Sequence, residues 1–428
     1  MADTHNFRQE ISAGRFDAAL KKIYVSNDAV LRQRERYADL LHDFDNYYNG
    51  ARDIRFFSAP GRTEVGGNHT DHNNGKVLAA AINLDVVGAA AKNDENIIRV
   101  KSKKYRNMDV VDLSVLDVVP NEAEHSSALI RGTCAKFRAL GYQIGGFDAV
   151  TVSDVLRGSG LSSSAAFEVL IGTILNYLYN DGKISPVVIA QTAQYAENEY
   201  YKKPCGLMDQ TASSVGGFVT IDFKDNASPV ITPVDFDFNA CGHALCIVDT
   251  RADHADLSED YAAIRYEMNA VAGEFGQTVL RFVDEAAFYK NIGAVKKQTG
   301  ERAVLRAMHF FEDNKRVDRE VDALRRGDFE AFKQNIIESG YSSYMYNQNV
   351  YTTKKPASQP VALALALSEQ VLRGKGAWRV HGGGFAGTIQ AFVPLSLLDT
   401  YKAAMEGLFG EGACHVLQIR AFGGTEVV

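Results

Sequence analysis

The sequence lacks the markers of several large protein classes. Its five cysteines are scattered, and no C-x-x-C pair or zinc-ligand spacing occurs among them, so we expect reduced thiols in a cytoplasmic protein. No apolar run approaches the length of a membrane span, and the first ten residues, MADTHNFRQE, contain no apolar core of a signal peptide. These absences predict a protein that is neither exported through a signal peptide nor embedded in a membrane.

An excess of positive charge is also missing. The formal net charge is −7, which argues against general binding to nucleic acid or to an anionic membrane surface. A site for an anionic ligand must therefore be built locally, from backbone amides, a few cations or a metal ion. The chain has 428 residues, which is enough for two domains with a large core. We expect it to be a monomer or a weak homo-oligomer.

The order of the expected elements favours an α+β fold. Strands and helices do not alternate with the regularity of a doubly wound parallel sheet. The N-terminal half has the patterns of helices at 29–48, 163–180 and 185–201 and of strands at 96–101 and 147–153. Ser185 as N-cap, followed by Pro186, marks the start of the last of these helices.

The polar segment 223–233, which contains two prolines, is the predicted domain boundary. We expect an N-terminal domain over 1–225, with a helical extension at 1–50, and a C-terminal domain over 226–428. The second domain is expected to begin with the strand LCIVDT. Its long helices are predicted at 256–274, 301–325 and 328–338.

The run APGRTEVGGNHTDHNNG at 59–75 is the most polar motif of the chain, and the apolar run VLAAAINLDVV follows it directly. So many hydrogen-bonding side chains between glycine- and proline-marked bends are not typical of a solvated linker. We interpret the motif as a loop that holds a ligand with many hydroxyl groups and rests on buried structure.

A second motif, LRGSGLSSSAAFEVLIGTIL at 156–175, places glycines and serines directly before an apolar helix. Glycines let the backbone approach a ligand, and a helix N-terminus offers unpaired N–H donors and a positive dipole end to an anion. A serine hydroxyl can also bind Mg²⁺. The Walker A pattern is absent. Taken alone, the motif is equally consistent with a serine-capped helix that follows a turn.

Two further motifs complete the set. AENEYYKKPCGLMDQTASSVGG at 196–217 contains Glu197 and Asp209, and Asp209 is either a partly buried acid or the N-cap of a helix. HGGGFAGT at 381–388 indicates close backbone packing, either against a ligand or between core elements. Together the four motifs predict phosphoryl transfer from a nucleotide to a sugar.

The chain resembles the galactokinases of the GHMP small-molecule kinase superfamily over roughly residues 55–428. The family's sugar signature, G-R-x-N-x-I-G-E-H-x-D-Y, corresponds to GRTEVGGNHTDH, and its phosphate loop, G-x-G-L-S-S-S-A, corresponds to GSGLSSSAAF. The family's AEH…CGIMDQ and TGGGFGG correspond to AEN…CGLMDQ and HGGGFAG. The resemblance implies two α+β domains with the active site between them, and a reaction of galactose with ATP and Mg²⁺ that yields galactose 1-phosphate and ADP.

The same resemblance implies roles for individual residues. Asp209 corresponds to the catalytic aspartate and Arg62 to the arginine paired with it, while Ser164 and Glu197 correspond to the Mg²⁺ ligands. The implied phosphate loop consists of Gly158, Ser159, Gly160, Leu161, Ser162, Ser163 and Ser164. The implied sugar contacts are Asn68, His69, Asp71, Gly206, Asp209 and Tyr261.

The chain departs from the family pattern within the sugar signature. Asn68 replaces the glutamate that lies near the 6-hydroxyl of the sugar in galactokinases, His72 replaces a tyrosine, and EVGG replaces NLIG. The lost carboxylate keeps galacturonate, or another sugar altered at C6, as an alternative substrate. A sugar-sensing regulator without catalysis is a further alternative, although the complete SSSAA run and the presence of Arg62 and Asp209 favour an enzyme.

Overall fold

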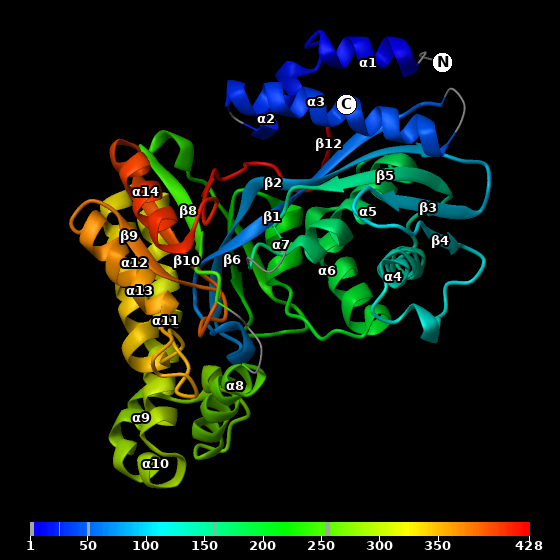
Figure 1. The fold of residues 1–428 in the computed structure, drawn as a ribbon. Helices are drawn as coiled ribbons and strands as arrows, with labels where there is room; N and C mark the ends of the chain where they lie inside the picture. The colour runs from blue at the N-terminus through cyan, green and yellow to red at the C-terminus, as the bar shows by residue number, and fades with distance from the viewer. Residues whose placement is uncertain (1–3, 25, 49–51, 157–159, 253–256) are drawn as a thin grey trace.

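The computed structural model describes residues 4–24, 26–48, 52–156, 160–252 and 257–428. These residues form two β-sheets, and helices pack against both of them (Figure 1). The first sheet has eight strands in the described residues: β1 (Arg55–Gly66), β2 (Lys76–Lys92), β3 (Ile97–Ser102), β4 (Asp109–Asp112), β5 (Phe147–Ser153), β6 (Phe218–Asp222), β7 (Val230–Val234) and β12 (Thr425–Glu426). Its main order is β12-β1-β2-β5-β3-β4, with β6 pairing to β2 and to β7.

The second sheet is smaller and wholly antiparallel. It contains β8 (His243–Asp249), β9 (Ala377–His381), β10 (Thr388–Pro394) and β11 (Cys414–Leu417), in the order β11-β8-β10-β9. In the first sheet, the one parallel pair among the described strands is β3 with β5. This mixture of helices and mainly antiparallel sheets confirms the α+β class. The boundary after residue 225 stays a prediction, and β7 and β12 both belong to the first sheet.

Helices occur in both halves of the chain. The first half of the chain contains α1 (Thr4–Ser12), α2 (Asp17–Tyr24), α3 (Asn27–Tyr47), α4 (Ser126–Ala139), α5 (Ser163–Tyr179), α6 (Pro186–Tyr195) and α7 (Met208–Val215). The second half contains α8 (Ser258–Gly273), α9 (Glu285–Lys290), α10 (Ile292–Thr299), α11 (Glu301–Arg325), α12 (Phe329–Ser342), α13 (Pro360–Leu372) and α14 (Leu398–Phe409). Shorter turns that matter for the site are η1 (Asp71–Asn73), η3 (Ala196–Tyr201) and η6 (Ser343–Asn347).

Most of the expected helices are confirmed within a few residues. The exception is the helix expected over 185–201, which ends as an α-helix at Tyr195 and continues as the π-helical turn η3. Ser185 accepts a hydrogen bond from the backbone N–H of Val188, as an N-cap does, and Pro186 is the first helical residue. Helices α4, α9, α10, α13 and α14 were not expected from the sequence.

The apolar run after the sugar signature is the central strand β2, and both of its faces are buried. Because side chains alternate along a strand, Val87 and Ala89 pack with Leu41 of α3, while Ala90 belongs to the core that contains Leu170 of α5. Helices α1–α3 lie across the outer face of the first sheet, opposite α5 (Figure 1). The N-terminal extension therefore covers an apolar sheet face that would otherwise meet water.

Two of the sequence-based exclusions can be compared with the structure. Within the described ranges, no helix combines the length and the apolar character that crossing a membrane requires. All five cysteines are free thiols.

Candidate functional site

The sugar signature begins on a strand, which corrects the expectation of a loop. Arg62 and Glu64 lie on β1 and pair with residues of β2, and only the segment from residue 67 to 75 forms a turn, which includes η1. The polar side chains are compatible with a strand because partners on other elements satisfy them. The carboxylate of Glu64, for example, accepts a hydrogen bond of 2.7 Å from the buried guanidinium of Arg379 on β9.

Asp209 forms the centre of the predicted catalytic pair. Its Oδ1 atom accepts a hydrogen bond from Nε of Arg62 at 2.7 Å and forms an ion pair with Nη2 at 2.6 Å, and its Oδ2 atom accepts a hydrogen bond from the hydroxyl of Ser162. Asp209 lies in the first turn of α7 and does not cap that helix with its side chain. The side chain of Asp209 is 31% exposed and that of Arg62 is 11% exposed, so a ligand can reach the carboxylate.

The phosphate-loop motif packs directly against this pair. Arg62 donates its backbone N–H to the carbonyl of Leu161 at 3.1 Å, and its guanidinium donates to the carbonyl of Gly160. A Cβ atom at Gly61 would lie 2.8 Å from the carbonyl of Leu161, so this contact requires glycine. Ser162 precedes the first turn of α5, where Ser163 and Ser164 lie. Gly158 and Ser159, also predicted for the loop, lie outside the described residues.

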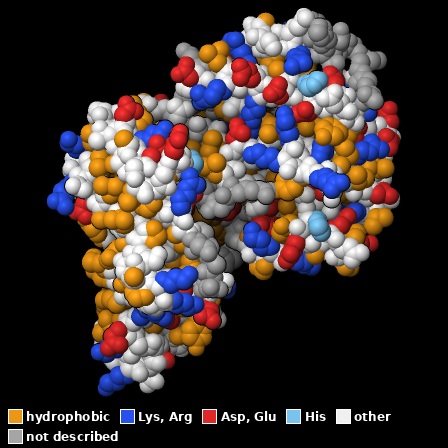
Figure 2. Space-filling model, in the orientation of Figure 1, with side chains coloured by type: hydrophobic (Ala, Val, Ile, Leu, Met, Phe, Trp, Pro, Cys, Tyr) orange, Lys and Arg blue, Asp and Glu red, His pale blue; other side chains and the backbone are white. Residues whose placement is uncertain are grey.

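A cavity of about 800 Å³ opens beside the start of α5. Ser163, Ser164 and Glu197 line it, so the structure brings both predicted metal ligands to one cavity. The cavity is of the size that holds small ligands. Figure 2 shows many Lys and Arg side chains on the half that contains the first sheet. The cationic residues among the cavity's lining are Lys103, Lys104, Arg106 and Lys203.

Glu168 and Gln210 lie beside the predicted metal ligand Glu197, although neither was predicted from the sequence. The side-chain amide of Gln210 donates to Glu168 (3.1 Å) and to Glu197 (2.8 Å), and Lys203 pairs with Glu197 at 3.0 Å. Glu168 lines the cavity, and its Oε1 atom is buried without a hydrogen-bond partner among the described residues. Burial and the neighbouring Glu197 carboxylate raise the pKa of Glu168 well above its usual range. The sequence signal that could have identified Glu168 is a carboxylate among the apolar residues of the helix that follows the phosphate loop.

The imidazoles of His69 and His72 form a directed chain of hydrogen bonds. His69 Nε2 lies 2.8 Å from the carbonyl of Gly383 and must donate to it, so His69 Nδ1 accepts from His72 Nε2 at 3.2 Å. His72 Nδ1 then accepts from the amide of Asn73 at 3.2 Å. This assignment requires both rings to be neutral. Burial lowers the pKa of His69 to about 3 and also lowers the pKa of His72.

Three of the predicted sugar contacts converge on the glycine turn between β9 and β10. Asn68 donates to the carbonyl of Gly382 at 2.7 Å, His69 reaches Gly383, and the Tyr261 hydroxyl donates to the carbonyl of Gly384 at 3.0 Å. Gly383 must lack a side chain, because a Cβ atom there would lie 2.5 Å from the Tyr261 ring. The sugar signature and HGGGFAGT, more than 300 residues apart, are therefore one structural unit.

Asp71 and Gly206 lie next to each other. A methyl group at Gly206 would be 3.6 Å from Oδ2 of Asp71. No hydrogen bond or ion pair of the Asp71 carboxylate is found among the described residues, and the side chain is half-buried. Of the carboxylates in the sugar signature, Asp71 is therefore the one that is open to a ligand.

The buried neutral imidazoles predict a loss of stability in acid. His69 titrates near pH 6.5 in the unfolded chain and at about 3 in the folded chain, so between these values the unfolded state binds more protons. We expect His69 to lower the free energy of unfolding by up to about 1.4 kcal/mol per pH unit as the pH falls below 6.5. Urea denaturation at pH 7.5, 6 and 5 measures this, and an unaltered slope in His69→Gln would contradict the assignment.

Comparison with known proteins gives consistent results. Residues 42–92 match the galactokinase galactose-binding signature, and residues 128–217 match the N-terminal domain of GHMP kinases. A galactokinase from Streptomyces coelicolor is 31% identical over 365 residues, which cover 84% of this chain and 90% of that protein.

Solved structures show the same fold. The Lactococcus lactis galactokinase complexed with galactose is similar with a TM-score of 0.75 and 22% identity, over 91% of this chain and 100% of that one. The Methanococcus jannaschii mevalonate kinase is similar with a TM-score of 0.60 and 15% identity, over 87% and 99% of the two chains.

Proposed function

The chain belongs to the galactokinase family of the GHMP kinases, and from this premise we propose that it transfers the γ-phosphoryl group of ATP to the C1 hydroxyl of galactose. The observation that carries the proposal is the contact of Asp209 with Arg62 and Ser162 at the start of α5. A carboxylate held there is next to both the sugar signature and the phosphate-loop motif. The products are galactose 1-phosphate and ADP.

The chemistry follows from the placement of these groups. Asp209 accepts or orients the proton of the attacking hydroxyl, and Arg62 holds the carboxylate while its positive charge stabilises the transferring phosphoryl group. The N-terminus of α5, with Ser163 and Ser164, offers N–H and hydroxyl donors to the phosphate oxygens. The groups predicted to contact the sugar come from the signature, from Gly206 and Asp209, and from Tyr261 on α8.

Mg²⁺ would be held by Ser164 and Glu197. Both residues line the same cavity, and hard oxygen donors of this kind suit the ion. The unpartnered buried oxygen of Glu168 beside Glu197 also fits a cation nearby. When bound, Mg²⁺ neutralises negative charge on the phosphate oxygens of ATP.

The test is a coupled assay of ADP release with ATP against galactose, galacturonate, glucose, arabinose and N-acetylgalactosamine, each with Mg²⁺ and with excess chelator. We expect the highest kcat/KM with galactose and no turnover in chelator. A reaction without sugar provides the background of ATP hydrolysis. Highest kcat/KM with galacturonate would support the second candidate substrate, which the uncharged Asn68 motivates. If no sugar gave ADP release above the background, this would refute kinase activity and favour a sugar sensor.

A further inference from the structure

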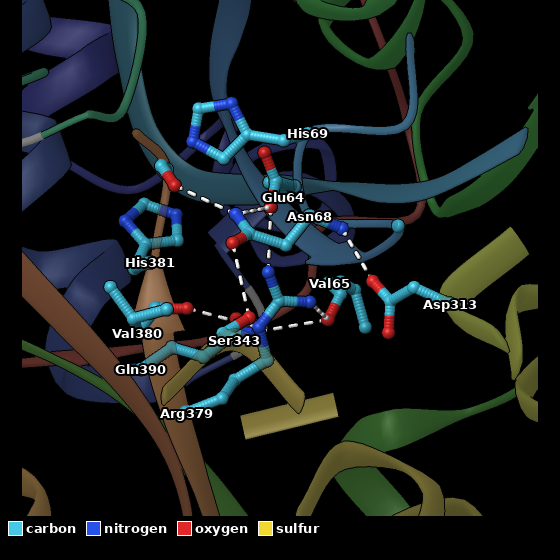
Figure 3. Close-up of polar contacts among 12 residues, drawn as sticks. Glu64, Val65, Asn68, His69, Asp313, Ser343, Arg379, Val380, His381 and Gln390 are labelled. Atoms are coloured by element: carbon cyan, nitrogen blue, oxygen red, sulfur yellow. Dashed lines mark hydrogen bonds and ion pairs between the residues drawn. The ribbon is translucent and has the colours of Figure 1, made fainter. Parts of the chain in front are cut away.

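Asn68 uses its whole side chain on contacts within the protein (Figure 3). Its Nδ2 group donates to Glu64 at 3.0 Å and to the carbonyl of Gly382 at 2.7 Å. Its Oδ1 atom accepts from the Ser343 hydroxyl at 3.1 Å and from the Asn349 amide at 2.8 Å. An asparagine side chain has two donor hydrogens and two acceptor lone pairs, and all four are occupied.

Both backbone polar groups of Asn68 also have partners. Its N–H donates to Asp313 at 2.8 Å, and its carbonyl accepts from His309 Nε2 at 2.8 Å, with both partners on α11. The residue is 0% exposed. Asn68 thus makes six hydrogen bonds, one of them to β1 and five to elements of the C-terminal half. Every polar atom of Asn68 therefore has a partner within the protein, and none is exposed to a sugar hydroxyl.

Glu64 and Asn68 have exchanged residue types relative to the family signature. The pattern G-R-x-N-x-I-G-E-H has asparagine where this chain has Glu64 and glutamate where it has Asn68. The hydrogen bond between these two side chains joins the amide of Asn68 to the carboxylate of Glu64. In this chain, the carboxylate is on β1 and faces Arg379, and the amide reaches Gly382 (Figure 3).

We infer that Asn68 is a positioning residue for the proposed kinase reaction and does not bind the sugar itself. This inference rests on the proposed function. Asn68 holds the turn that carries His69 and Asp71 against the Gly382–Gly384 turn, so it fixes where those residues meet the ligand. Relative to the family signature, the exchange with Glu64 places an amide at position 68 in place of a carboxylate.

The test compares Asn68→Asp with the wild-type enzyme on galactose and on its 2-, 3-, 4- and 6-deoxy analogues. The carboxylate that this substitution introduces cannot donate to Gly382 or to Glu64, so we expect kcat/KM to fall for every sugar. The ratio of kcat/KM for galactose to that for each analogue should stay within about twofold of the wild-type ratio, as for groups that do not touch. A larger change confined to one analogue, above all the 6-deoxy sugar, would show a direct contact and overturn the inference.

Two further variants make the test decisive. Ser343→Ala removes one hydrogen bond to the same amide, so it should reproduce the uniform loss even if Asn68→Asp does not fold. Asp71→Asn changes the open carboxylate and should alter the ratio for at least one deoxy sugar.

The midpoint of thermal unfolding tests the inference about Asn68 without depending on kinase activity. Asn68→Asp and Ser343→Ala should lower the midpoint, whereas Asp71→Asn should leave it unchanged. If the wild-type protein does not phosphorylate galactose, the proposed function fails. The midpoints still test whether the hydrogen bonds of Asn68 hold the turn in place. An unchanged midpoint in Asn68→Asp and Ser343→Ala would then refute the inference.

Discussion

Replacing Asp209 by asparagine is expected to lower kcat for galactose by about 10²–10⁴-fold, the usual contribution of a positioned general base. An amide cannot take up the proton of the attacking hydroxyl, and it loses the charge-assisted bonds that Arg62 makes to Oδ1. The KM for ATP should change little, because Asp209 does not line the cavity beside α5. Steady-state kinetics with varied galactose and varied ATP measure both effects.

Asp222→Asn is a matched control for this substitution. Asp222 is also a partly exposed aspartate paired with an arginine, Arg281, at 2.8 Å, and it ends β6 outside the cavity and outside the Arg62 pair. We expect wild-type turnover from Asp222→Asn, and unchanged ADP affinity and thermal midpoint in both variants. Turnover near that of the wild type in Asp209→Asn would remove Asp209 from the catalytic role.

Arg379→Met is expected to lower the free energy of unfolding by about 3–5 kcal/mol, as loss of one partner from a buried ion pair does. The guanidinium is 0% exposed, and it donates to Glu64 at 2.7 Å and to the carbonyls of Val65 and Val380 at 2.9 Å each. Without it, the carboxylate of Glu64 stays buried and uncompensated. Urea denaturation of the variant and the wild-type protein measures the difference.

The loss of stability in Arg379→Met is expected to depend on pH. Burial raises the pKa of Glu64, and Arg379 partly offsets this effect, so the substitution should raise that pKa further. Because protonation of Glu64 then favours the folded state, the deficit should be larger at pH 8 than at pH 5.

Glu64→Gln provides the control for the buried charge. It keeps an acceptor for Asn68 and removes the charge, so the double variant with Arg379→Met should be more stable than Arg379→Met alone. Equal stability of the two would contradict an uncompensated carboxylate as the cause.

The local features of the site were predictable because they depend on short stretches of sequence. The glycine and serine run before α5, the N-cap at Ser185 and the Glu197–Asp209 spacing each lie within a few turns of chain. The long helices and strands followed from hydrophobic periodicity in the same way. The loop expected for the sugar signature was wrong for Arg62 and Glu64, because the partners that allow polar side chains on a buried strand are distant in the chain.

The sequence by itself determined the phosphate-loop motif, the two acids of the predicted catalytic and metal sites, and the resemblance to one kinase family. The tertiary structure alone decided which polar groups are open to a ligand. Asn68 is not available to a ligand, because its side-chain amide forms hydrogen bonds with Gly382, Ser343 and Asn349. The carboxylate of Asp71 has no such partners among the described residues. Each side chain has a fixed number of donors and acceptors. Most of those of Asn68 are used by residues about 300 positions away in the chain, so a local sequence pattern cannot show whether they are free.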